Sequence, residues 1–150
     1  MPPITSPRLL PAPDDQAAGF VRQRDRARQA IAQDYVELIA DLMREEGEAR
    51  PVDLARRLGV SQATVTATVA RLQRDGLVQT KPYRAIFLTE EGQAMADESA
   101  ARHQLVVRFF VALGVPLATA EADAEGVEHH LSRATLAAFA AFVAAQDSGG

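Results

Sequence analysis

Apolar residues recur at steps of three and four between Phe20 and Gly47, which is the spacing of one helical face. The residues of this stripe are Ile31, Tyr35, Leu38, Ile39 and Leu42. Gly47 follows the last of them, and glycine is typical of the position just after a helix. The pattern therefore predicts a first long helix over residues 20–47.

Two shorter helical segments follow, with a turn between them. Residues 51–58 begin with proline, which a first helical turn tolerates, and Gly59-Val60 supplies the turn. Ser61 is a good N-cap for the next segment, because its hydroxyl can accept a free backbone N–H. The apolar face of that segment consists of Val65, Val69 and Leu72. Two helices joined by a short glycine-containing turn predict a helix-turn-helix.

Short strand-like runs come next, and the rest of the chain is helical in pattern. Residues 77–81 and 85–88 flank Pro82-Tyr83-Arg84 and predict a β-hairpin, the wing of a winged helix-turn-helix. Helices are predicted over 90–113, 117–131 and 133–146. The last is rich in alanine, which allows close helix packing and suits a dimer interface as well as a core.

The predicted fold class is mostly α, an N-terminal winged helix-turn-helix followed by a C-terminal α-helical dimerisation domain. Five of the eight prolines lie in residues 1–13, which favours disorder at the start of the chain. The predicted parts are a disordered N-terminal arm over 1–19, a DNA-binding domain over 20–89, and a metal-binding and dimerisation domain over 90–150.

Composition excludes several kinds of site, and the basic residues concentrate in one segment of the chain. The chain has no cysteine, which rules out thiolate zinc sites, Fe–S clusters and thiol catalysis. Net charge is −4, yet residues 50–84 hold seven basic and two acidic side chains. Such a basic segment in an acidic chain favours a partner rich in phosphate. The N-terminus lacks a signal-peptide pattern and no apolar run reaches membrane-spanning length, so a cytoplasmic protein without a membrane partner is expected.

The helix-turn-helix contains candidates for DNA contact. Small polar residues near the start of a recognition helix can reach base edges, and arginines can bind phosphates. The base-reading candidates are Ser61, Gln62, Thr64 and Thr66, and the phosphate-binding candidates are Arg71 and Arg84.

A second group of residues has the composition of a metal site. Glu125, Glu128 and His129 are spaced to share one helix face. Asp34 and Glu37 form another pair three residues apart, and His103 is a third contributor. Gly126 in mid-helix suggests close approach of a helix or an ion, because glycine is costly there.

These six side chains restrict the choice of ion. Carboxylates and imidazoles without sulfur suit Mn²⁺, with Fe²⁺ or Zn²⁺ as competitors. Six ligand side chains exceed what one ion takes alongside water, so two ions per subunit are plausible.

Several motifs occur in the order seen in the DtxR, or iron-dependent repressor, family. They are DYVELI at 34–39, LGVSQATV at 58–65, FLTEEG at 87–92, Arg102-His103, and DAEGVEHHLS at 123–132. The chain resembles the manganese-responsive members of that family across about residues 20–146. Ala63 stands where relatives often carry proline, and Ala67 where they often carry a longer polar residue, so the motif does not specify the operator sequence.

This resemblance implies a homodimer with a binuclear Mn²⁺ site between two parts of the chain. One part is the winged helix-turn-helix over residues 20–89, called the reading head below, and the other is the dimerisation region. Its ligands would be Asp34, Glu37, His103, Glu125, Glu128 and His129, whereas His130 matches a histidine that is not a ligand and is assigned a structural role. The iron-sensing branch has methionine and cysteine at the positions of Asp34 and Glu125, so the oxygen donors here favour manganese. No SH3-like third domain is expected.

The predicted function is a Mn²⁺-activated, sequence-specific repressor of manganese homeostasis genes, bound to double-stranded operator DNA. One alternative is a repressor of the same family that responds to iron or another divalent metal. A two-metal hydrolase is another, although no spare general base accompanies the ligands. A winged-helix regulator that senses an organic ligand is the last.

Overall fold

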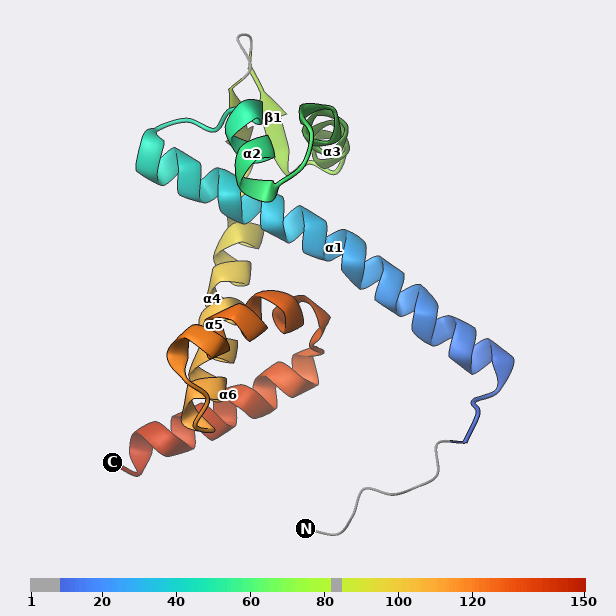
Figure 1. Ribbon diagram of the computed structural model, residues 1–150, viewed down its shortest axis with the longest axis vertical. Coiled ribbons are helices and arrows are strands. Elements are labelled where there is room, and N and C mark those ends of the chain that lie inside the picture. The colour runs from blue at the N-terminus through green and yellow to red at the C-terminus, as the bar shows by residue number, and fades with distance from the viewer. Residues whose placement is uncertain (1–8, 82–84) are drawn as a thin grey trace.

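The computed structural model describes residues 9–81 and 85–150 of the 150-residue chain. Its elements are α1 (Pro13–Glu46), α2 (Pro51–Leu58), α3 (Gln62–Arg74), β1 (Val78–Thr80), β2 (Ile86–Leu88), α4 (Glu90–Ala112), α5 (Leu117–Val127), the 3₁₀ turn η1 (Glu128–His130) and α6 (Arg133–Ser148). Figure 1 shows the winged helix at one end, α5 and α6 at the other, and α4 running between the two. The predicted fold class is confirmed.

The helix-turn-helix forms for the local reasons that the sequence indicates. Gly59 adopts a left-handed conformation with φ 68° at the end of α2. Ser61 caps α3, with its Oγ accepting a hydrogen bond from the Thr64 backbone N–H at 3.1 Å. After α3, β1 and β2 pair antiparallel, with Val78 opposite Leu88. The tip of this wing, including the predicted phosphate contact Arg84, lies outside the described residues.

The predicted start of the first helix is wrong. The helix α1 begins at Pro13, so residues 13–19 of the expected arm are helical. Proline suits the first turn of a helix, and Asp14 and Asp15 favour the positive end of the helix dipole. No apolar stripe marks this part of α1, because most of its side chains up to Gln29 are exposed, Phe20 to 53%.

The predicted helix over 117–131 is also too long. The α-helix α5 ends at Val127, and Glu128–His130 tighten into the 3₁₀ turn η1. Such turns are common where a helix ends, and here Leu131 is already extended before Ser132 caps α6. A Cβ placed at Gly126 would meet no atom within 4 Å in the described part of the chain, so a close approach there is not seen.

The hydrophobic core of the winged helix is closed by α1. From the reading head, Leu54, Val65, Leu72 and Ile86 are fully buried. From α1, the buried residues are Tyr35, Val36, Ile39 and Leu42. Because these residues occupy one face of α1, the neighbouring Asp34 and Glu37 remain half-buried at the edge of the core.

Gly92 allows the start of α4 to lie against the wing. Thr89 caps α4 by accepting from the Gly92 N–H at 3.1 Å and donates its own hydroxyl to the Gly76 carbonyl at 2.6 Å. A Cβ at Gly92 would overlap the carbonyl oxygen of Leu77. The helix that leads to the C-terminal half is thus fixed directly to the DNA-binding half.

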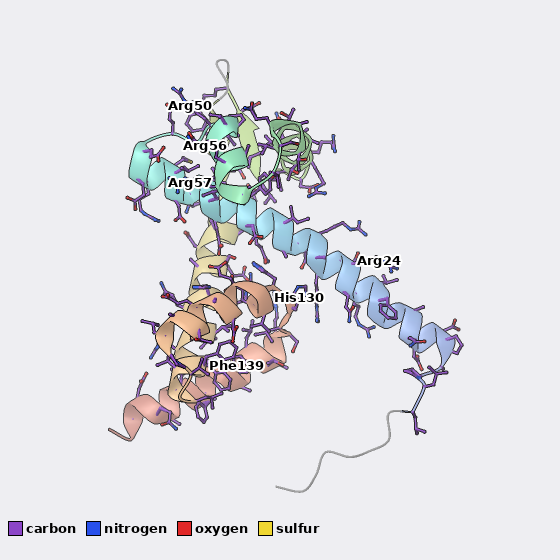
Figure 2. The ribbon with its side chains drawn as sticks, in the orientation of Figure 1. Arg24, Arg50, Arg56, Arg57, His130 and Phe139 are labelled. Carbon is purple, nitrogen blue, oxygen red and sulfur yellow. The ribbon has the colours of Figure 1, made fainter. Side chains whose placement is uncertain are left out.

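The C-terminal half has a smaller core. Phe109 of α4 stacks on Phe139 of α6 with ring centroids 3.7 Å apart, and Figure 2 labels Phe139 among these helices. Several large apolar side chains remain exposed, namely Val111, Leu113, Leu117 and Phe142. Among the described helices, none has a stretch long and apolar enough to cross a membrane.

Candidate metal centre

The six predicted ligands come from three regions of the chain and meet between α1, α4 and the end of α5. Asp34 and Glu37 lie on α1, His103 lies on α4, and Glu125 lies on α5. Glu128 and His129 belong to η1.

One subset gathers around His103. Its Nδ1 lies 2.6 Å from Glu128 Oε2 and 3.7 Å from Glu125 Oε1. Ligand atoms of His103, Glu125 and Glu128 all lie within 4.8 Å of one another, a spacing that a single cation can bridge. Glu37 lines a cavity of about 530 Å³ together with His103 and Glu125, which places it beside this subset.

The other subset gathers around His129, whose side chain is only 4% exposed. Its Nε2 lies 3.2 Å from Asp34 Oδ1 and 3.5 Å from Glu128 Oε1. Glu128 is therefore shared, with one carboxylate oxygen beside each histidine. Its side chain is 1% exposed, which is unusual for a carboxylate unless it is paired.

Two atoms of this cluster are buried without a hydrogen-bond partner among the described residues. They are Glu128 Oε1 and His129 Nε2, which face each other across the 3.5 Å gap. An unsatisfied buried polar atom costs free energy, about 1–3 kcal/mol. A divalent cation would satisfy both lone pairs at once, so the donor set fits a bound metal ion.

The environment changes the proton affinity of three groups. Burial raises the pKa of the Glu128 carboxyl, although the hydrogen bond from His103 opposes this. Burial also raises the pKa of Glu37, against the effect of the nearby Ser99 hydroxyl. The Asp34 carboxylate, which lies beside Nε2, raises the pKa of His129, against the effect of burial. A bound cation would favour the ionised form of these buried carboxyls and so offset the effect of burial.

Two contacts around η1 involve residues that sequence reasoning missed. Gln33 Oε1 lies 2.6 Å from Nδ1 of His129, and Arg26 donates to the backbone carbonyl of His130 at 3.0 Å. Neither residue belongs to a ligand motif, so only the fold reveals them. His130 itself keeps an exposed side chain, and Figure 2 shows it at the end of α5 near α1.

The DNA-contact candidates lie mostly on the exposed surface of α3. Ser61, Gln62, Thr64 and Thr66 are exposed and Arg71 is half-buried. Three of the hydroxyls already make local hydrogen bonds, since Ser61 donates to Thr64 Oγ1 and Thr66 donates to the Gln62 carbonyl. The long amide of Gln62 is therefore the side chain best suited to reach a base edge.

The basic segment is partly neutralised by acidic residues that precede it. Arg57 pairs with Glu46 at 3.4 Å, and Arg50 pairs with Glu48 at 2.6 Å. Figure 2 shows Arg50, Arg56 and Arg57 together on the α2 side of the winged helix. The net charge counted along residues 50–84 thus overstates the field at the surface.

Comparison with known proteins gives two family matches, which together cover most of the chain. Residues 29–86 match the iron dependent repressor N-terminal DNA binding domain. Residues 89–147 match the iron dependent repressor metal binding and dimerisation domain. The first match begins well inside α1, so the helical residues 13–28 precede it.

Close relatives extend the match. The transcriptional regulator MntR of Escherichia coli O6:H1 is 50% identical over 129 residues, or 86% of this chain and 83% of the relative. The HTH-type transcriptional regulator MntR of Geobacillus kaustophilus is 37% identical over 100 residues, or 67% of this chain and 71% of the relative.

Solved structures agree on the fold. A manganese-dependent transcriptional repressor in complex with manganese matches with a TM-score of 0.68 and 30% identity, over 75% of this chain and 52% of that one. The manganese regulator SloR matches with a TM-score of 0.65 and 24% identity, over 75% of this chain and 53% of that one. The chain thus spans about half the length of these structures. With both family matches and relatives at 50% identity, the chain belongs to the iron-dependent repressor family of metal-responsive, DNA-binding transcriptional repressors.

Proposed function

We propose that this protein is a Mn²⁺-activated repressor that binds operator DNA as a homodimer and controls genes of manganese homeostasis. The observation that carries the proposal is the buried Glu128 carboxylate, whose two oxygens lie beside two different histidines. The Oε1 atom of Glu128 and the Nε2 atom of His129 have no hydrogen-bond partner among the described residues.

The donor set favours Mn²⁺ over softer ions. All six candidates offer carboxylate oxygen or imidazole nitrogen, and the chain contains no thiolate. The two subsets around His103 and His129 share Glu128, which supports two ions per subunit. Relatives named MntR and a repressor structure with manganese point to the same metal. Fe²⁺ and other divalent ions compete for such ligands, and they form the alternative reading of the same site.

The mechanism follows from which part of the molecule supplies each ligand. Asp34 and Glu37 belong to the helix that closes the core of the winged helix, whereas the other four belong to the C-terminal half. A bound cation supplies positive charge that attracts ligands of both halves. With both halves held, the reading head is restricted to fewer orientations, which favours the spacing of two adjacent major grooves.

The proposed DNA-binding surface consists of exposed polar residues at the start of α3 and of two arginines. Gln62, exposed at the N-terminus of α3, is the proposed base-reading residue, and Ser61, Thr64 and Thr66 are proposed to lie near the groove. Arg71 and Arg84 are assigned to phosphates. The exposed apolar side chains of the C-terminal half, such as Leu113 and Leu117, are available for burial against a second copy.

The test is a gel shift with DNA from upstream of the protein's own gene and of neighbouring transporter genes, with Mn²⁺, Fe²⁺ or chelator. We expect retardation with Mn²⁺ and none with chelator. Glu128→Ala should abolish the metal-dependent shift, because both subsets lose their shared carboxylate. Glu121→Ala removes an exposed carboxylate two turns earlier and should bind as the unsubstituted chain does. Persistent Mn²⁺-dependent binding by Glu128→Ala would refute the proposal, and a shift with Fe²⁺ alone would favour the iron-responsive alternative.

A further inference from the structure

We propose that Gln33 is a positioning residue that fixes the ring of His129 for metal binding; this rests on the proposed function. The Oε1 atom of Gln33 lies 2.6 Å from Nδ1 of His129, and this contact joins α1 to η1 across 96 residues of sequence. Gln33 lies outside the set of carboxylates and histidines that form the candidate centre.

The hydrogen bond determines which ring nitrogen carries the proton. An amide oxygen can only accept, so Nδ1 of His129 must be the donor in this contact. The neutral ring then has its lone pair on Nε2, the atom that lies beside Asp34 and Glu128. Metal-binding histidines in general donate their other ring N–H to an oxygen in this way, which fixes the tautomer and the ring orientation.

The position of Gln33 on α1 explains how one helix holds both edges of the ring. Gln33 contacts Nδ1 and the next residue, Asp34, lies beside Nε2. Two turns earlier, Arg26 donates to the carbonyl of His130 at 3.0 Å. Two hydrogen bonds that need no metal therefore join η1 to α1 beside the candidate ligands.

The test compares two substitutions at this position. Gln33→Met keeps the length of the side chain but cannot accept a hydrogen bond, whereas Gln33→Glu still can. Gln29→Met, one turn earlier on an exposed part of α1, is the matched control.

The first readout is the tautomer of His129 in the metal-free 150-residue chain. Long-range ¹H–¹⁵N NMR at a pH where imidazoles are neutral reports it, and with only three histidines assignment is simple. We expect the Nδ1–H form in the unsubstituted chain, in Gln33→Glu and in Gln29→Met, and a mixture of forms in Gln33→Met. An Nε2–H form in the unsubstituted chain, or no change in Gln33→Met, would overturn the proposal.

The second readout is Mn²⁺ affinity by calorimetry. Loss of such a supporting hydrogen bond weakens metal binding by about 10–100-fold. We expect that loss in Gln33→Met, with affinity retained in Gln33→Glu and in Gln29→Met. Equal losses in Gln33→Met and Gln33→Glu would contradict the role of Gln33, even if Gln33→Met were poorly folded. Absence of Mn²⁺ binding by the unsubstituted chain would instead contradict the proposed function, and the NMR result would still decide whether the contact with Gln33 holds the proton of His129 on Nδ1.

Discussion

The burial of Glu128 makes the stability of the metal-free protein depend on the protonation of the candidate metal centre. Glu37, Glu128 and His129 all have a raised pKa in the fold, so the folded chain binds protons more tightly than the unfolded chain. This tighter proton binding contributes to the free energy of unfolding at low pH, and the contribution is lost as pH rises through the raised pKa values. The loss begins above about pH 4.5 for the carboxyls and above about 6.5 for the histidine.

We therefore expect Glu128→Gln, which stays neutral, to gain stability relative to the unsubstituted chain as pH rises. Thermal unfolding with chelator at about pH 5 and about pH 8 measures this, because ionisation of Glu128 costs free energy only in the unsubstituted chain. Addition of Mn²⁺ should reverse the order of the two proteins at the higher pH. A difference between them that does not change with pH would show that Glu128 is not buried as described.

At the residue scale the sequence indicates candidate ligands but not the side chains that contact them. The spacing of Glu125, Glu128 and His129 indicates that they share one face. The structure brings Glu125 and Glu128 beside His103 and brings His129 beside Asp34. The hydrogen bond from His129 to Gln33 depends on how α1 lies against η1, which no local pattern encodes. The pairing of Arg57 with Glu46 was missed for the same reason.

At the scale of elements, the junction between the wing and α4 is the most constrained contact. Gly92→Ala would force the new Cβ against the Leu77 carbonyl, which belongs to the backbone and cannot rotate away. We expect a loss of about 1–3 kcal/mol in unfolding free energy, the usual cost of overpacking. Urea denaturation with chelator measures it.

Gly126→Ala is the matched control, because its Cβ meets nothing within the described residues and the position is helical. It should stabilise the chain by up to about 1 kcal/mol. Equal destabilisation by both substitutions would mean that α4 does not approach the wing as closely as described.

Helix ends marked by a capping residue or by a glycine were predicted well, and helix ends without such a residue were not. The start of α3 follows from Ser61 and the end of α2 from Gly59, since both act within their own turn. The start of α1 was misplaced because most of residues 13–29 are exposed and show no apolar period. The 3₁₀ turn was missed because its residue spacing still fits an α-helix.

At the scale of the whole molecule, we expect α1 to couple metal binding to DNA binding, because it carries Asp34 and Glu37 and also closes the core of the winged helix. If Mn²⁺ raises the affinity for operator DNA by some factor, operator DNA must raise the affinity for Mn²⁺ by the same factor. We expect a factor of about 5–150, the usual range of such coupling. Calorimetry of Mn²⁺ binding with and without operator duplex measures it, with a scrambled duplex as control. An Mn²⁺ affinity that operator DNA leaves unchanged would rule out the coupling.

One stretch of α1 serves two purposes. Tyr35 and Val36 are buried in the core of the winged helix, while Asp34 and Glu37 on the adjoining faces belong to the proposed metal centre. No flexible linker separates the two, so a shift of these carboxylates moves the reading head with it. Evolution of a new metal preference at this stretch is therefore constrained by DNA recognition, and variants selected for one trait should carry compensating changes in the other.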